Sequence, residues 1–473
     1  MSIILTNDQK IKNNQLIKLN KIKVIIQGFG VIGASTAVNI VSSNNFDNNF
    51  QVHCIDKKNL AGIKKIYDAK KGIFPIKSSD KLLSTYLRKA LYKKRISFGF
   101  DEKEYKNADI IIVSINCDLE NKNAIKIREF RQSIISILEN ISENTLLIIE
   151  STVPPGTCER IIYPDLKKIT KQRKINIEKI YLAHSFERVT PGENYLISCR
   201  NSYRVYAGIN KISEEKCKKF LKKIINVKQY PLTKLMNITS SETCKLMENS
   251  YRAVNIAFID EWVKFSNNLN INLFDIIDSI KKRKTHNNIM LPGLGVGGYC
   301  LTKDPLFAKI STKQILKQKK QSFPLCSSAV AINQKMPNTS MDFIEQNYKK
   351  KLKEKKVLFL GVSYKNEISD LRFSPSLDLI KKFINKKSKC FYFDPFVERV
   401  NIKGLTRVQL LSQLNNFDLI VFCVNHLKFK KIKFTKKLSN GKNYLFDLNN
   451  VLTLNQINKI KKQNINFYSL GRD

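Results

Sequence analysis

Residues 22–33 read Ile-Lys-Val-Ile-Ile-Gln-Gly-Phe-Gly-Val-Ile-Gly, and the small-residue run Ala-Ser-Thr-Ala-Val-Asn-Ile-Val follows at 34–41. The stretch at 22–27 predicts a short buried strand, because four of its six residues are apolar and a glycine follows it. The run at 34–41 predicts a helix. A strand, a glycine turn and a helix in direct succession are typical of a nucleotide-binding α/β sheet.

Three glycines form the turn, and each has a separate task. Gly28 permits the tight turn, Gly30 lets the backbone approach a pyrophosphate, and Gly33 lets the helix pack against the strand. Val31 and Ile32 open the helix, whose free N–H groups would face the phosphates. An incidental glycine turn is the alternative interpretation.

An acidic residue stands where this motif needs one. A second predicted strand at 51–55 ends at Asp56, 23 residues after Gly33. A carboxylate at this strand end accepts a hydrogen bond from a ribose 2′-hydroxyl and repels a 2′-phosphate. The sequence therefore favours NAD over NADP as the cofactor.

Apolar strands alternate with helices on either side of a helical stretch. Strands are predicted at 110–115, 146–149, 180–183 and 203–207, then at 357–360, 390–393, 419–424, 444–446 and 467–469. Between these sets lie predicted helices at 242–267, 273–281 and 327–346, the last with a possible break at Pro337. The fold class is α/β, with two Rossmann-like parallel-sheet domains joined by a central helical region. The expected divisions are a polar extension 1–20 and domains 21–235, 236–345 and 346–473.

The chain carries 83 Lys and Arg against 40 Asp and Glu, a formal charge of +43. A nucleic-acid-binding surface would explain this charge. The basic residues are dispersed, however, and Lys, Asn and Ile are abundant throughout, so we interpret the charge as a compositional bias. Nucleic acid is not an expected partner.

The ten cysteines form no Cys-x-x-Cys pair and no metal cluster with histidine, so no metal site is predicted. No apolar run is long enough to span a membrane, and residues 1–20 lack the apolar core of a signal peptide. We therefore expect a cytoplasmic protein with reduced thiols and no membrane partner.

A second glycine-rich stretch, 292–304, contains two reactive side chains. Four glycines in six residues exclude a helix or an ordinary strand, and Cys300 and Asp304 follow. A thiolate can attack an aldehyde, and a carboxylate four residues on can move a proton. A buried cysteine after a structural turn is the alternative.

Six motifs in order resemble the UDP-glucose/GDP-mannose dehydrogenase family, the nucleotide-sugar 6-dehydrogenases. Besides the Gly28 turn and the 293–304 loop, they are Glu-Ser-Thr-Val-Pro-Pro-Gly-Thr at 150–157, His-Ser-Phe-Glu-Arg-Val-Thr-Pro-Gly at 184–192, Lys-Leu-Met-Glu-Asn-Ser-Tyr-Arg at 245–252 and Gly-Val-Ser-Tyr-Lys-Asn-Glu-Ile-Ser-Asp-Leu-Arg-Phe-Ser-Pro at 361–375. The resemblance implies an NAD domain, a central dimerisation region and a nucleotide-gripping C-terminal domain. The partners it implies are a UDP-sugar and a second copy of the chain, in a homodimer or higher homo-oligomer.

The resemblance also implies a four-electron oxidation of a sugar CH₂OH to a carboxylate with two NAD. Cys300 would form a thiohemiacetal and then a thioester. Asp304 with Lys245 would manage protons and charge, and Asn249 would hold the oxyanion. Glu187 and Thr152 would position water, and Thr152 would also lie at the cofactor.

For substrate binding, the resemblance points to eight positions, namely Glu187, Arg188, Lys245, Asn249, Arg252, Gly297, Lys365 and Arg372. Each has an ordinary alternative: Lys245 and Asn249 could be a solvated helix face, and Arg372 could be a salt-bridge partner of Asp370. The family usually has a Val-Pro-Thr-Pro-like segment after the third strand, where this chain has Val-Ser-Ile-Asn-Cys-Asp at 113–118.

The motifs at 187–192 and 248–257 are more similar to the UDP-N-acetylhexosamine branch, so UDP-N-acetylglucosamine or UDP-N-acetylmannosamine is the expected substrate, for surface polysaccharide synthesis. UDP-glucose is the alternative sugar. A hydroxyacid dehydrogenase is the alternative enzyme class, since it shares the glycine turn but needs no nucleophilic cysteine.

Overall fold

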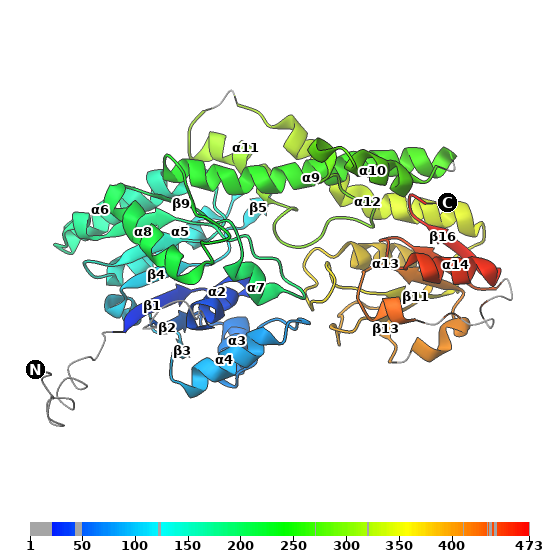
Figure 1. Ribbon diagram of the computed structural model, residues 1–473, viewed down its shortest axis with the longest axis horizontal. Coiled ribbons are helices and arrows are strands. Elements are labelled where there is room, and N and C mark those ends of the chain that lie inside the picture. Colours follow the sequence, from blue (N-terminus) through cyan, green and yellow to red (C-terminus); the bar gives the residue numbers. More distant parts are fainter. Residues whose placement is uncertain are drawn as a thin grey trace, which may run out of the picture.

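The computed structural model describes residues 21–42, 50–121, 124–269, 271–318, 321–409, 411–432, 434, 438 and 442–472. The expected extension 1–20 lies outside these residues. Two α/β units lie side by side, and the long helix α9 (Ile238–Leu269) runs along both of them (Figure 1). The predicted α/β class with two Rossmann-like units is confirmed.

The first unit is an eight-stranded sheet in the order β10-β9-β8-β7-β4-β1-β2-β3. Its strands are β1 (Ile22–Gln27), β2 (Phe50–Ile55), β3 (Ile96–Gly99), β4 (Ile110–Val113), β7 (Leu146–Ile149), β8 (Tyr181–His184), β9 (Val205–Gly208) and β10 (Thr233–Lys234). The helices of this unit are α2 (Val31–Ser42), α3 (Leu60–Lys70), α4 (Leu82–Tyr92), α5 (Ile127–Asn140), α6 (Tyr163–Gln172), α7 (Tyr195–Arg200) and α8 (Lys211–Ile224).

Strands β4 and β7 are buried at every residue, because helices cover both faces of the sheet. One pairing departs from the expected parallel sheet: β9 runs antiparallel to β8. The connection through the short α7 returns the chain to the edge where β8 ended, so β9 starts there and runs backward. The expected strand 203–207 lies two residues later, at β9, and the expected 110–115 ends at Val113.

The central region consists of α9, α10 (Leu273–Lys281), α11 (Asp304–Gln314) and α12 (Pro324–Tyr348). The expected break at Pro337 is wrong, because α12 continues through it. Pro337 is buried in a helix that packs along α9, and this packing offsets the backbone hydrogen bond that proline cannot donate.

The second unit is a six-stranded sheet, parallel throughout, in the order β13-β12-β11-β14-β15-β16. Its elements are β11 (Lys356–Leu360), α13 (Pro375–Asn385), β12 (Lys389–Phe393), β13 (Leu405–Arg407), β14 (Leu419–Phe422), β15 (Tyr444–Asp447), α14 (Leu454–Lys462) and β16 (Asn466–Ser469). The strand expected at 419–424 ends two residues early, at Phe422, and the others agree within a residue.

A short backbone bridge joins the two units directly. Ser78 pairs with Ile368 as an antiparallel bridge, and the amide of Ser369 donates to the carbonyl of Lys77 at 3.0 Å. The amide of Ser79 donates to the carbonyl of Glu367 at 3.2 Å. The loop after β11 is thereby held against the first unit. In the part of the chain that the structure describes, no helix is long and apolar enough to cross a membrane.

Candidate active site

The glycine turn between β1 and α2 has the shape that a dinucleotide pyrophosphate needs. Gly28 has φ +97°, and a Cβ there would meet the Ser114 carbonyl oxygen at 2.7 Å. A Cβ at Gly33 would meet the Gly28 carbonyl oxygen at 1.9 Å, so the helix packs on the strand only with glycine there. A Cβ at Gly30 would meet nothing within 4 Å, so the space in front of it is open. Val31 and Ile32 start α2 directly behind this space, so the residues present fit NAD.

Asp56 lies at the end of β2 as expected. Its carboxylate accepts from the Lys57 amide at 2.7 Å and pairs with Lys65. It lines a cavity of about 710 Å³ together with Gln27, Lys58 and Phe100. The cavity has room for the adenosine end of a dinucleotide, with the carboxylate at its wall.

Lys245 on α9 is buried and contacts Glu187, which follows β8. Its Nζ donates to the Glu187 carbonyl at 2.6 Å and lies 3.4 Å from Glu187 Oε1. Burial opposes the ammonium form, but Glu187, Cys300 and Asp304 more than offset it and raise the pKa of Lys245. The side chain therefore remains a cation, suited to stabilising negative charge on oxygen rather than to acting as a base.

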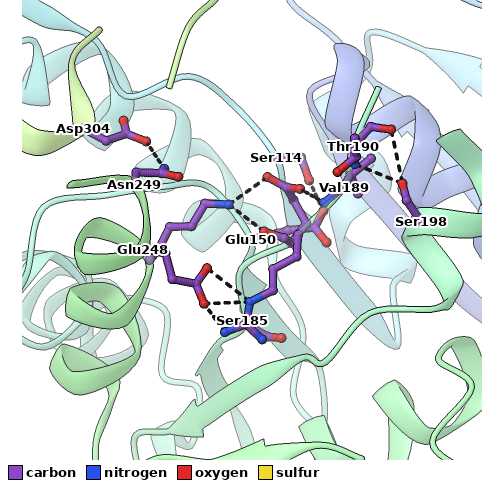
Figure 2. A network of polar contacts seen from close by, with 12 residues as sticks. Ser114, Glu150, Ser185, Val189, Thr190, Ser198, Glu248, Asn249 and Asp304 are labelled. Atoms are coloured by element: carbon purple, nitrogen blue, oxygen red, sulfur yellow. Dashed lines mark hydrogen bonds and ion pairs between the residues drawn. The ribbon is translucent and has the colours of Figure 1, made fainter. Parts of the chain in front are cut away.

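Asn249 lies one helical turn after Lys245 and faces Asp304 at the start of α11 (Figure 2). Its Nδ2 donates to Asp304 Oδ2 at 2.7 Å, while Lys303 Nζ donates to the other oxygen at 2.6 Å. Asp304 is fully buried, and each of its oxygens accepts a hydrogen bond from one of these two side chains. Lys303 was not among the expected site residues, although it adjoins Asp304 in the same motif.

Cys300 lies in the loop before α11 and is exposed. Desolvation of the sulfur and the carboxylate of Asp304 raise the pKa of its thiol to about 11, although Lys245 opposes this. The charges of Asp304, Lys245 and Glu187, which the resemblance places in the same site, therefore act on the Cys300 thiol. The thiol is protonated at neutral pH, so it must lose its proton as it attacks.

Thr152 lies in the half-buried turn after β7. This turn is held by Glu242 of α9, which lies one helical turn before Lys245. Glu242 is buried, and its two oxygens accept from the amides of Gly156 at 2.6 Å and Cys158 at 2.8 Å. Burial raises the pKa of Glu242 to about 8. The sequence analysis missed Glu242, although it lies on the same helix face as Lys245.

Glu150 is a second missed residue, and it lies at the centre of a buried network. Its carboxylate accepts from Thr36 on α2 at 2.9 Å and from Arg204 at 2.7 Å. It also accepts from Ser114 at 2.6 Å (Figure 2). The pair with Arg204 is almost completely buried. It therefore ties the cofactor helix to the loops after β4 and β7.

The opposite side of the site comes from the loop after β11. Burial and the neighbouring charge of Arg252 on α9 lower the pKa of Lys365 to about 8. No carboxylate in the described part of the chain forms an ion pair with Lys365 or Arg252. Gly297 lies against the same loop, since a Cβ there would meet the Phe373 carbonyl oxygen at 2.7 Å.

Two expected substrate contacts have partners within the protein. Arg372 Nε donates to Asp370 Oδ1 at 3.0 Å and its Nη2 donates to Oδ2 at 2.6 Å, which is the salt bridge expected as the alternative to substrate binding. Arg188 forms an ion pair with Glu248 and donates to the Tyr203 carbonyl. Neither guanidinium is without a counter-charge in this structure.

Three domain models of one family match the chain. They are the UDP-glucose/GDP-mannose dehydrogenase family NAD binding domain at residues 21–227, the central domain at 239–335 and the UDP binding domain at 358–454.

Individual relatives match along nearly the whole chain. The UDP-N-acetyl-D-mannosamine dehydrogenase of Methanococcus vannielii is 31% identical over 93% of this chain and 94% of its own length. The structure of the UDP-N-acetyl-mannosamine dehydrogenase Cap5O from Staphylococcus aureus is 25% identical, with a TM-score of 0.73 over 95% of this chain and 98% of that one. A UDP-glucose dehydrogenase from Pyrobaculum islandicum is 19% identical, has a TM-score of 0.78 over 96% and 99%, and shows the fold alone.

The glycine turn lies in the matched NAD binding domain, the α9 residues and Asp304 lie in the central domain, and the loop after β11 lies in the UDP binding domain. The chain belongs to the UDP-glucose/GDP-mannose dehydrogenase family and is an NAD-dependent nucleotide-sugar dehydrogenase.

Proposed function

We propose that the chain oxidises the C6 hydroxymethyl group of UDP-N-acetylmannosamine to the carboxylate, with two NAD per sugar. The observation that carries this is the cluster of Cys300, Lys245, Asn249, Asp304 and Glu187. In the oxidation of an alcohol by NAD, a nucleophilic thiol serves the second step, which carries the aldehyde on to the acid. The name of the Methanococcus vannielii relative supports the sugar. UDP-N-acetylglucosamine is the next candidate and UDP-glucose the third.

When bound, NAD supplies the hydride acceptor for each of the two oxidations. In the first, the C6 hydroxyl loses its proton while Lys245 and Asn249 stabilise the charge on its oxygen. Asp304 is the carboxylate at which that proton is accepted, directly or through water. The bonds from Asn249 and Lys303 fix Asp304 for this task before any substrate arrives.

In the second half, the Cys300 thiol adds across the aldehyde. Sulfur bonds to carbon, and the thiol proton passes through Asp304 to the carbonyl oxygen, which gives a neutral thiohemiacetal. Loss of a hydride and a proton from this adduct leaves a thioester. Water then cleaves the carbon–sulfur bond, returns the thiol and leaves the sugar carboxylate. We assign the positioning of that water to Glu187 and Thr152.

We assign the diphosphate of the nucleotide to Lys365 and Arg252. Two neighbouring cations without a carboxylate partner are unfavourable until an anion binds between them. Gly297 would bring its loop close to the sugar. Arg188 and Arg372 would support this site through their pairs with Glu248 and Asp370.

We propose a homodimer through an apolar stripe on α9. The stripe consists of exposed Met247, Tyr251, Phe258, Trp262, Phe265 and Leu269, which recur at spacings of three, four and seven residues. Such a stripe on one helix face is a surface that a second copy covers. We place the enzyme in the cytoplasm, in keeping with ten free cysteines, and we place its acidic product in surface polysaccharide synthesis.

The test is NADH formation by the purified chain with NAD and each of UDP-N-acetylmannosamine, UDP-N-acetylglucosamine, UDP-glucose and GDP-mannose. We expect UDP-N-acetylmannosamine to give the highest kcat/KM, with two NADH for each sugar consumed. One NADH per sugar would overturn the thioester route, and a preference for UDP-glucose would overturn the sugar.

A further inference from the structure

The segment after β4, residues 114–118, makes a contact between two domains. Asp118 lies at the base of the hairpin of β5 (Leu119–Asn121) and β6 (Ala124–Ile125), and its carbonyl accepts from the Lys126 amide at 2.8 Å. Its carboxylate accepts a hydrogen bond from the hydroxyl of Tyr299, 181 residues away in the chain. Tyr299 directly precedes Cys300, so this bond joins the NAD domain to the catalytic loop.

Tyr299 passes the contact on to the catalytic carboxylate. Lys303 Nζ lies 4.4 Å from the centre of the Tyr299 ring and 4.2 Å from that of Phe307. The same Nζ donates to Asp304 at 2.6 Å, and Asp304 accepts from Asn249. Contacts therefore run without a break from Asp118 through Tyr299, Lys303 and Asp304 to α9.

The space beside this chain of contacts is open. Asp118, Tyr299 and Lys303 line a cavity of about 650 Å³ that also borders α12 and the loop before α13. This open space adjoins Tyr299 and Lys303, so these side chains have room to move if the Asp118–Tyr299 bond is lost. Burial and Asp118 both raise the pKa of Tyr299, so the hydroxyl keeps its proton and the bond persists across the working pH range.

We infer that Asp118 is a positioning residue for the oxidation: by holding Tyr299, it sets the catalytic loop so that the Cys300 thiol and the Asp304 carboxylate face the same substrate carbon. This inference rests on the function proposed above. Asp118 acts through Tyr299 and touches neither reacting atom.

The first experiment compares Asp118→Ala, Asp118→Asn and Tyr299→Phe in the full chain. A hydrogen bond to a charged group corresponds to about a 10- to 100-fold effect, so we expect Asp118→Ala and Tyr299→Phe each to lower kcat by that factor. KM for the UDP-sugar should change less than about threefold. Asp118→Asn keeps an acceptor oxygen and should restore most of kcat. The double variant should be no worse than the worse single variant.

Tyr181→Phe is the matched control, since its hydroxyl also donates to a side chain, Asn144, at 3.4 Å but far from the catalytic loop. It should leave kcat unchanged. Additive losses in the double variant, or a Tyr299→Phe enzyme with full kcat, would overturn the inference.

A second readout needs no turnover, and so it separates this inference from the proposed function. Iodoacetamide alkylation of Cys300, followed by peptide mass spectrometry across pH, reports the reactivity of the thiol. Release of the loop should move the sulfur away from the Asp304 carboxylate, which raises the thiol pKa. The pKa should therefore fall, and alkylation near neutral pH should speed up by about fivefold or more. An unchanged pH profile in both Asp118→Ala and Tyr299→Phe would overturn the inference even if the enzyme is active. A wild-type chain that oxidises no UDP-sugar, together with faster alkylation in the variants, would overturn only the proposed function.

Discussion

The two sides of the active site differ in whether their charged side chains have partners of opposite charge. On the α9 side, Lys245 pairs with Glu187, and Asp304 accepts from Asn249 and Lys303, so the ionised groups are matched within the protein. On the side of the loop after β11, Lys365 lies near Arg252, and the repulsion helps to lower the lysine pKa. One side is electrostatically complete, and the other has an excess of positive charge.

This difference assigns different tasks to the two sides. Groups that stabilise a transition state work best when they are already oriented, because no reorganisation is then needed during the reaction. Groups that bind a diphosphate gain most when their repulsion is relieved on binding. We therefore expect substitutions on the α9 side to lower kcat and substitutions of unpaired cations to raise KM.

The largest effect is expected from replacing the reacting atom on the α9 side, the Cys300 sulfur. Cys300→Ser should lower the rate of acid formation by roughly 10³-fold or more, because a serine hydroxyl is a far weaker nucleophile toward the aldehyde. Binding of the UDP-sugar, measured by calorimetry, should stay within about threefold of wild type. Cys326→Ser, on α12, is the control and should retain full activity. An active Cys300→Ser enzyme that still yields two NADH per sugar would contradict the thioester route.

The next largest effect concerns the unpaired cations. Lys365→Met should weaken UDP-sugar binding by about 10- to 100-fold, the loss expected for a charge-assisted hydrogen bond. The kcat at saturating sugar should fall much less. Lys381→Met removes a lysine of α13 that pairs with exposed Asp378, and it serves as the matched control. A Lys365→Met enzyme with normal KM and reduced kcat would reverse the assignment of the two sides.

The pH dependence of binding sharpens the same point. A pKa of about 8 means that Lys365 is an ammonium below that pH and loses its charge above it. Affinity for the UDP-sugar should therefore be highest below about pH 8 and should fall by up to about tenfold per unit above it. Calorimetric titrations across this range measure the effect. Lys365→Arg, whose guanidinium stays charged, should remove the decline, and a decline that persists in this variant would exclude Lys365 as its source.

Most of the fold could be predicted from sequence because its signals are local. The apolar runs, the glycine turn and the long uninterrupted helix each depend on neighbouring residues. The expected strands and the turn lie within about two residues of their places, and α9 begins four residues before the expected start at 242. The departures have tertiary causes. Strand β9 is antiparallel to β8 because the connection through α7 ends at the edge of the sheet where β8 ended. Helix α12 continues through Pro337 because it packs along α9.

The site was predicted in part. The motifs predict a set of substrate contacts, but they could not show which of these residues already have partners within the protein. Arg188 and Arg372 appeared equivalent to Lys365 in the sequence, and only the fold brings Glu248 beside the first. Glu150 and Asp118 act on residues far away in the chain, so no spacing rule could identify them.

Arg188 provides the smallest expected effect and the strictest check on the comparison. It is a cation in a family motif beside Glu187, yet it pairs with Glu248, and both side chains are partly exposed, at 26% and 36%. A pair of this exposure stabilises a fold by only about 0.2–1 kcal/mol. Arg188→Ala should therefore lower stability by about that amount in thermal unfolding and change KM for the UDP-sugar less than about threefold. If KM rises as far as in Lys365→Met, then Arg188 leaves Glu248 to bind substrate, and pairing within the free protein does not decide which cations bind the nucleotide.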